Sequence, residues 1–258
     1  MIYKSLVDEL SEDNGQDEKI IKSFYSQDSL SSDIFEKTGE GYKMIDAVRD
    51  RLLIIADNFI DFLGVEFFVH DAVLTGSLAN YNWSEYSDID LHIIIDYDES
   101  GHNIPLLTEF FNAKKNAWNQ VHDIKIKNYE VEIYVQDIKE KHVSSGVYSV
   151  LNNNWIVKPQ KEKQKIDDRL ILDKGEEYAK LIDKLILKKN KGIDVIDVID
   201  AVDDIRRKIK RFRQSGLDKG GEYSYENLTF KLLRRNGYIK KLLDLKKEVV
   251  DRKLSVNN

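Results

Sequence analysis

The 258-residue sequence contains no cysteine, which excludes disulfides, thiolate metal sites and cysteine nucleophiles. No apolar run approaches the roughly 20 residues that a transmembrane helix needs. The N-terminus is acidic and polar, and it carries no secretory or transit pattern. P-loop, Gly-x-Ser-x-Gly and zinc-ligand spacings are absent as well. We therefore expect a cytoplasmic protein without a membrane partner.

Charged residues make up 33% of the chain and hydrophobic residues 41%, which predicts a folded, highly charged globular protein. The formal net charge is -6, but it is unevenly distributed. Residues 201–258 hold 16 Lys and Arg against 8 Asp and Glu, a net of +8, so the remainder carries -14. This asymmetry is compatible with a phosphate-bearing ligand, and equally with helix surfaces that are simply rich in Lys and Arg.

Three segments differ in their patterning. Residues 1–41 are acidic and weakly periodic, which predicts a leader with one or two short, loosely packed helices. Residues 42–158 alternate helical and extended patterns, and residues 159–258 are helical. No internal repeat or low-complexity linker separates them, so the boundary near residue 159 is a change of composition and not a flexible tether.

The middle segment predicts an α+β or α/β sheet of about four to five strands. An apolar stripe from Ile45 to Leu63 indicates a helix, and Gly64 follows where a helix C-terminus is expected. The further expected elements are a strand or strand pair over 65–74, an apolar central strand over 87–96, a helix over 106–121, and a hairpin over 124–135 that turns near Asn128.

The last segment predicts helices over 173–190, 194–214, 225–235 and 238–250. Three glycines between the second and third of these helices predict a loop; they are Gly216, Gly220 and Gly221.

One stretch of the middle segment carries residues suited to phosphate chemistry. Gly76 and Ser77 close a strand and open a short helix, where free backbone N–H groups favour an anion. Asp88 and Asp90 follow in an apolar strand, and since residues i and i+2 share a face, their carboxylates lie side by side. Two like charges on one buried face are costly unless a cation neutralises them. Oxygen ligands suit Mg²⁺ or Mn²⁺ with a bound triphosphate.

A third carboxylate is expected from a neighbouring strand. Glu132 is the better candidate because it lies mid-strand between two aliphatic residues, and Glu130 is the alternate. Such a group could accept the proton of an attacking hydroxyl as well as bind a metal ion. His92 shares a strand face with the two aspartates, and we expect it to be a structural, hydrogen-bonded histidine.

These residues resemble the DNA polymerase β-like nucleotidyltransferase superfamily. Its signature is a Gly-Gly or Gly-Ser pair, roughly nine to thirteen residues, an Asp-apolar-Asp/Glu-apolar run, and a later acid on another strand. Gly76-Ser77, a ten-residue gap, Asp88-Ile-Asp90-Leu and then Glu132 are similar to that whole pattern. The resemblance covers about residues 66–136. Two departures are Thr75 in place of an apolar residue, and Glu where the third acid is more commonly Asp.

The resemblance implies a role for each residue and a fold. Asp88 and Asp90 would bind the metal ions, Gly76 and Ser77 would contact the triphosphate, and Glu132 would activate the acceptor hydroxyl. A mixed β-sheet flanked by helices would form the nucleotidyltransferase catalytic domain over residues 42–158, followed by a helical domain over 159–258.

The helical domain commonly supplies a cation to the triphosphate in this superfamily. Lys231 and Arg234 are candidates for that role, as are the cations of the helix over 194–214. A solvated helix face is the simpler explanation of the latter.

The resemblance implies a Mg²⁺- or Mn²⁺-dependent enzyme that moves an NMP from an NTP such as ATP to an acceptor hydroxyl and releases pyrophosphate. The acceptor classes that stay open include a structured RNA 3′ end such as that of tRNA, a small molecule and a protein. A module that binds a nucleotide without catalysis is the alternative from another class.

Overall fold

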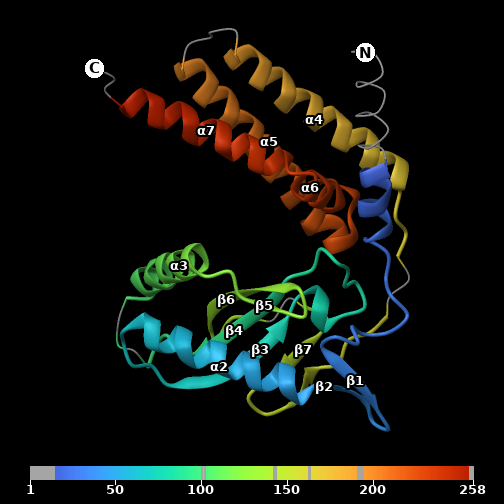
Figure 1. Cartoon of the computed structure of the whole chain (residues 1–258), viewed down its shortest axis with the longest axis vertical. Helices are drawn as coiled ribbons and strands as arrows, with labels where there is room; N and C mark the ends of the chain where they lie inside the picture. Colours follow the sequence, from blue (N-terminus) through green and yellow to red (C-terminus); the bar gives the residue numbers. More distant parts are fainter. Residues whose placement is uncertain are drawn as a thin grey trace. The chain divides into compact units, whose positions relative to one another are not determined.

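The computed structural model describes residues 15–99, 101, 103–141, 144–161, 164–190 and 195–255. Contacts divide the chain into two compact units (Figure 1). Residues 26–162 form the sheet unit, and residues 163–258 together with the residues up to Tyr25 form the helical unit. This division places the boundary a few residues after the predicted 158, and it splits the predicted 1–41 leader between the two units.

A six-stranded mixed sheet is the centre of the sheet unit. Its strands run in the order β5-β6-β4-β3-β7-β8. β4 pairs in parallel with β6, whereas the other neighbours are antiparallel. β4 is thus an interior strand, as its apolar sequence predicted. The bounds are β3 (Val69–Thr75), β4 (Ile89–Ile95), β5 (Lys125–Ile126), β6 (Tyr129–Asp137), β7 (Val147–Ser149) and β8 (Asn154–Val157).

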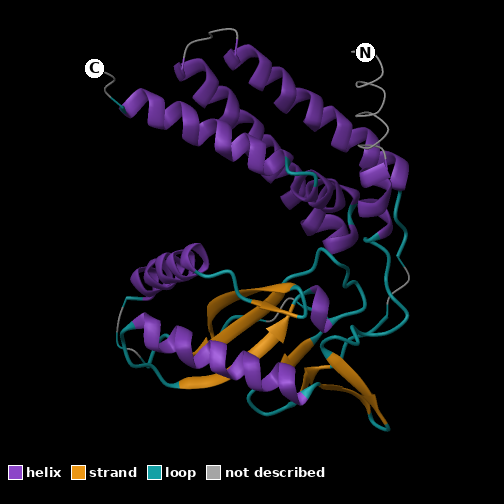
Figure 2. Cartoon of the chain, viewed as in Figure 1, coloured by secondary structure: helices purple, strands orange, loops and turns teal. Residues whose placement is uncertain are grey.

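Two helices, α2 (Asp46–Leu63) and α3 (Ile104–Val121), cover one face of this sheet (Figure 2). Ile89, Leu91 and Ile133 point into the core that these helices close. Because side chains alternate along a strand, the residues between them, including Asp90, lie on the other face. The polar residues of β4 therefore collect on the side of the sheet away from α2 and α3.

Local signals that the sequence carries are present in the structure. α2 ends at Gly64, whose φ of 72° is the left-handed conformation that favours glycine. The hairpin turns at Lys127 and Asn128, which both have positive φ, as a two-residue hairpin turn requires. The α+β fold and the mixed sheet are confirmed.

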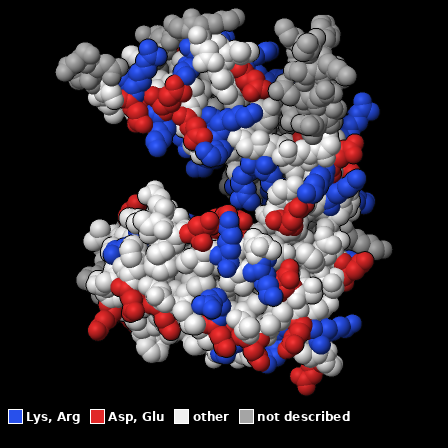
Figure 3. Space-filling model, in the orientation of Figure 1, with Lys and Arg blue, Asp and Glu red and all other residues white. Residues whose placement is uncertain are grey.

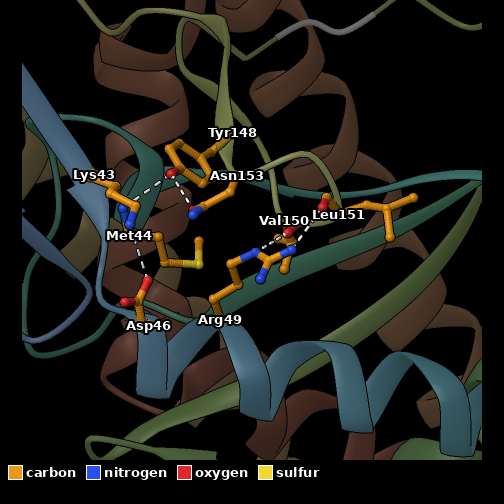
Figure 4. Close-up of polar contacts among 8 residues, drawn as sticks. All are labelled: Lys43, Met44, Asp46, Arg49, Tyr148, Val150, Leu151 and Asn153. Atoms are coloured by element: carbon orange, nitrogen blue, oxygen red, sulfur yellow. Dashed lines mark hydrogen bonds and ion pairs between the residues drawn. The ribbon is translucent and has the colours of Figure 1, made fainter.

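The sheet has more strands than predicted. β7 and β8 supply three and four residues each, and a separate hairpin pairs β1 (Phe35–Thr38) with β2 (Gly41–Met44). Segments this short are hard to recognise by periodicity, because a period of two needs several residues to show. The hydroxyl of Tyr148 on β7 accepts from the backbone N–H of Met44 and donates to Asn153 Oδ1, which ties the hairpin to the sheet (Figure 4).

The expectation of a loosely packed leader is wrong for its described part. Residues 15–22 are helical, and Ile20 and Phe24 are at most 4% exposed. Arg235 of the helical unit donates to Ser23 Oγ and lies over the Phe24 ring. The short helix itself was predicted, and burial of these apolar side chains accounts for its close packing. The first fourteen residues lie outside the described part.

The helical unit contains α4 (Asp168–Asn190), α5 (Val195–Gly220), α6 (Tyr225–Arg235) and α7 (Tyr238–Leu254). Their buried faces share one core that includes Ile182, Val202, Leu233 and Leu242. No described helix is long and apolar enough to cross a membrane.

The loop predicted at Gly216 is wrong, because α5 continues through this residue to Gly220. A β-carbon at Gly216 would lie 2.6 Å from both the Cβ of Glu226 and the Oγ of Ser224. The glycine therefore permits a close approach of α5 to the start of α6, and packing outweighs its low helix propensity.

Candidate active site

Strand register brings two of the predicted acids together. Asp90 on β4 is the direct partner of Glu132 on the parallel strand β6, and of Thr75 on the antiparallel strand β3. Register partners share a face, and neighbouring strands lie about 4.7–4.9 Å apart. Asp88 immediately precedes β4, two residues before Asp90. The acids thus lie on the sheet face opposite the core that α2 and α3 close.

The Gly76–Ser77 turn lies against these acids. Gly76 has a φ of 72°, and a β-carbon there would lie 1.9 Å from Oδ2 of Asp90. Ser77 opens the 3₁₀ helix η1 (Ser77–Ala79) and donates to Ser87 Oγ at 2.7 Å. That same oxygen accepts from the backbone N–H of Ser84 at 2.9 Å. The turn is therefore fixed at both sides, to Asp90 and to the loop that leads into Asp88.

A phenol is hydrogen-bonded to Glu132 and lies near the two aspartates. The Tyr134 hydroxyl donates to Oε2 of Glu132. Burial raises the pKa of this hydroxyl, the bonded Glu132 raises it further, and the charges of Asp90 and Asp88 add to the effect. All three acids therefore lie within electrostatic reach of one phenol. The ammonium group of Lys115 on α3 lies 3.9 Å from the centre of the same ring, in the range of a cation–π contact.

The structure separates the two candidates for the third acid. Glu130 is the register partner of Lys125, and Lys125 Nζ lies 3.6 Å from its carboxylate. Glu132, not Glu130, is the partner of Asp90. The geometry thus favours Glu132 as the acid that meets the aspartates.

His92 is hydrogen-bonded at both ring nitrogens, as expected of a structural histidine. Nδ1 lies 2.7 Å from Oε1 of Gln136, and Nε2 lies 3.3 Å from Oγ1 of Thr75. Its ring also lies beside the Tyr134 ring, with 5.0 Å between the centroids. His92 therefore links β3, β4 and β6 one step beyond the row of Thr75, Asp90 and Glu132.

The sequence predictions included neither Tyr134 nor Lys115. Tyr134 had a usable signal, because it follows Glu132 by two residues and therefore shares its face. Lys115 had none, since a lysine on an amphipathic helix is indistinguishable from a solvated surface cation until the tertiary fold is known.

The predicted cations Lys231 and Arg234 belong to α6 in the helical unit. Lys231 is half-buried, and burial lowers the pKa of its ammonium group. The charges of Arg235, Arg234 and Arg213 lower it too, while Glu222 opposes them. A desolvated lysine among other cations is a candidate anion site. Arg234 itself is exposed.

The basic stretch of α5 is largely an exposed helix face. Arg206 and Arg207 pair with Asp203 and Asp204 one turn away, as a solvated surface predicts. Arg213 differs, because it donates to Asn227 Oδ1 at 3.0 Å and stacks on the Phe230 ring at 4.3 Å. Figure 3 shows Lys and Arg side chains gathered on the visible face of the helical unit.

The acids fit a hard divalent cation in their chemistry. Among the described residues, no three His, Asp or Glu side chains are arranged to hold a metal ion as they stand. Asp88, Asp90 and Glu132 nevertheless offer only oxygen donors from one sheet face, the set that Mg²⁺ and Mn²⁺ prefer.

Comparison with known proteins gives a family match for this chain. The family model for the nucleotidyltransferase domain matches residues 56–219. The match includes the turn at Gly76, both aspartates and Glu132, and it extends through α5. No curated protein matches the chain by sequence. The resemblance drawn from the sequence is confirmed by this match.

Proposed function

The chain belongs to the nucleotidyltransferase domain family, and we propose that it transfers an NMP from an NTP to an acceptor hydroxyl. The observation that carries this proposal is the row formed by Asp90 and Glu132, with Gly76 packed against the Asp90 carboxylate. Phosphate-binding turn and carboxylates are the two parts that nucleotidyl transfer needs side by side. We assign catalysis to a domain of residues 42–158, and the cations that contact the triphosphate to a helical domain of residues 159–258.

Asp88, Asp90 and Glu132 would hold Mg²⁺ or Mn²⁺. When bound, such a cation stabilises negative charge on the attacking and leaving oxygens of an in-line displacement. Gly76 and Ser77 would receive the triphosphate, because the start of η1 presents backbone N–H groups to an anion. Lys231 and Arg234 would contribute positive charge to the same triphosphate.

Glu132 would accept the proton of the acceptor hydroxyl. The acceptor oxygen then bonds to the α-phosphorus as the bond from that phosphorus to the bridging oxygen breaks, and pyrophosphate leaves. Tyr134 would keep the Glu132 carboxylate oriented through its hydrogen bond.

We propose a structured RNA 3′ end, such as that of tRNA, as the acceptor. Support comes from a groove of about 470 Å³ along α5, α6 and α7. Its lining includes Arg206, Lys210, Arg213 and Phe230, beside Asp203 and several aliphatic side chains. Cations beside an aromatic ring suit a short stretch of nucleic acid. The net charge of -6 disfavours broad binding to long nucleic acid.

The test is incubation of the purified protein with each α-labelled NTP and Mg²⁺ or Mn²⁺, alone and with total cell RNA. Label that moves into RNA supports the RNA acceptor. Label on the protein or in a small product supports nucleotidyl transfer to another acceptor and removes the RNA proposal. NTP binding with no pyrophosphate released under any condition would make the chain a nucleotide-binding module.

Variants of the acids test the site. We expect Asp88→Asn, Asp90→Asn and Glu132→Gln each to lower turnover by at least about 100-fold, within the range for removal of one essential catalytic group. Glu130→Gln is the matched control, because it lies on the same strand and pairs with Lys125; its turnover should stay near that of the parent. Wild-type turnover in Asp90→Asn would refute the assignment.

A further inference from the structure

Asn80 lies directly after η1 and is only 6% exposed. Its side-chain amide Nδ2 donates to the backbone carbonyl of Gly76 at 2.9 Å and to Oγ of Ser144 at 3.2 Å. Its Oδ1 accepts from Oγ of Ser145 at 2.9 Å. Both amide hydrogens and the carbonyl oxygen are thus used, and each contact reaches a segment that borders the Gly76–Ser77 turn.

The partner segment, residues 144–146, packs closely against the end of η1. A β-carbon at Gly146 would lie 2.1 Å from the backbone oxygen of Ala79 and 2.7 Å from Oδ1 of Asn80. Ser144 Oγ donates to the carbonyl of Gly146 at 2.8 Å, which keeps the segment compact. Only glycine leaves room for this approach, so the backbone of residue 146 packs against the end of η1.

The segment reaches this place because of the sheet. It leads into β7, which pairs with β3 through Val73 and Leu74, and β3 ends at Thr75, next to Gly76. The 144–146 segment therefore runs alongside the end of the strand that delivers the glycine turn. Asn80 joins the two at a sequence separation of 64 residues.

From these contacts we infer that Asn80 is a positioning residue that clamps the 144–146 segment onto the Gly76–Ser77 turn and so fixes the turn for its nucleotide. The Asn80 amide holds the Gly76 carbonyl, and the Gly76 Cα lies against the Asp90 carboxylate. A shift of the turn would therefore displace the N–H groups offered to phosphate. This inference rests on the proposed function for the identity of the nucleotide.

The test compares Asn80→Ala with a Ser144→Ala/Ser145→Ala double variant, and with all three substitutions combined. We measure KM and kcat for α-labelled ATP with Mg²⁺, the affinity for ATP by equilibrium dialysis, and thermal unfolding. Asn58→Ala is the matched control, because Asn58 also donates its amide to a backbone carbonyl, that of Ile54, but lies exposed on α2.

We expect Asn80→Ala to raise KM and the dissociation constant for ATP about tenfold, while kcat changes less than about threefold. A tenfold change equals about 1.4 kcal/mol, in the range of one buried hydrogen-bonding group. The Ser144/Ser145 variant should produce a smaller increase, and its combination with Asn80→Ala should add nothing, since residues of one network are not additive. Asn58→Ala should leave KM, kcat and the dissociation constant for ATP unchanged.

An Asn80→Ala protein that is folded and retains the parental ATP affinity and KM would overturn the inference, as would additive effects of the two sets of substitutions. If Asn80→Ala does not fold, the Ser144→Ala/Ser145→Ala variant is used instead. A folded double variant with the parental ATP affinity and KM would then overturn the inference. Absence of turnover in the parent protein would count against the proposed function alone, because the dialysis measurement still reports whether Asn80 controls nucleotide affinity.

Discussion

The Cα of Gly76 packs against the carboxylate of Asp90, so that a β-carbon at position 76 would lie 1.9 Å from Oδ2. Two independent features therefore favour glycine at position 76: its φ of 72°, and the absence of space for a β-carbon beside Asp90. This contact relates the two halves of the motif, which are fourteen residues apart in the chain, through the pairing of β3 with β4.

Gly76→Ala should abolish turnover, because the new methyl group must push the Asp90 carboxylate out of place. Gly64→Ala is its matched control. Gly64 has the same φ of 72°, yet nothing lies within 4 Å of its would-be β-carbon. Gly64→Ala should lose about 1–2 kcal/mol of unfolding free energy to its left-handed backbone. Gly76→Ala should lose more, because φ 72° with ψ -161° is a conformation that only glycine adopts readily, and only Gly76→Ala should lose activity. Equal activity in the two folded variants would show that the contact with Asp90 does not matter.

Tyr134→Phe should lower kcat about tenfold and raise the Mn²⁺ concentration for half-maximal activity. The substitution removes the hydrogen bond that orients Glu132, while it keeps the ring beneath Lys115. A hydrogen bond from a neutral donor to a charged acceptor contributes about 1.5–3 kcal/mol. Mn²⁺ binding, followed by electron paramagnetic resonance, reports the same change without turnover.

Tyr97→Phe serves as the control for Tyr134→Phe, because Tyr97 is also buried and its hydroxyl donates to a backbone carbonyl, that of Val135. It should lower stability without a change in Mn²⁺ dependence. If both variants retain the parental kcat and Mn²⁺ affinity, Glu132 does not depend on Tyr134 for its orientation.

The sequence was informative wherever one residue type meets a local requirement. Gly64 at a helix end, the turn at Asn128 and the acids on an apolar strand all act within a few residues of the chain. Periodicity likewise located α6, which runs from Tyr225 to Arg235 as predicted.

What the sequence did not reveal depends on distant partners. Asn80 meets Ser144 across 64 residues, and Lys115 meets Tyr134 only because α3 packs beside β6. The sequence predicted a loop at Gly216. Glycine is needed there inside a helix because Glu226 approaches closely, and that contact exists only in the folded helical unit. Such contacts follow from tertiary packing, on which local propensity has no bearing.

Arg49 should be a stability residue with no catalytic part. Its Nε donates to the carbonyl of Val150 at 2.7 Å, and its Nη2 to that of Leu151 at 2.8 Å, which fastens α2 to the turn after β7 (Figure 4). Arg49→Met should lower the unfolding free energy by about 1.5–3 kcal/mol, the range for hydrogen bonds to a charged group. Denaturant unfolding measures the loss.

Lys43→Met is the control for Arg49→Met. Lys43 lies on β2, and its Nζ pairs with Asp46 of α2 at 3.2 Å in an exposed i,i+3 contact (Figure 4). Such pairs contribute about 0–1 kcal/mol. Equal losses in the two variants would mean that the Arg49 contacts add nothing beyond a surface pair.

Lys231→Met should stabilise the protein and weaken nucleotide binding at once. Burial holds the pKa of Lys231 below its ordinary value of 10.5, so the unfolded chain binds more protons between the folded and unfolded pKa values. Stability should therefore rise with pH through that window, up to about 10.5, and the rise should shrink in Lys231→Met. Below the window, removal of the desolvated charge should raise the unfolding free energy by about 0.5–2 kcal/mol.

The same substitution should increase the KM for ATP, because the proposed triphosphate contact is lost while the apolar stem is kept. Lys240→Met, an exposed lysine of α7 paired with Asp244, should change neither the pH dependence of stability nor KM. A Lys231→Met protein that is more stable yet binds ATP as tightly as the parent would remove Lys231 from the nucleotide site.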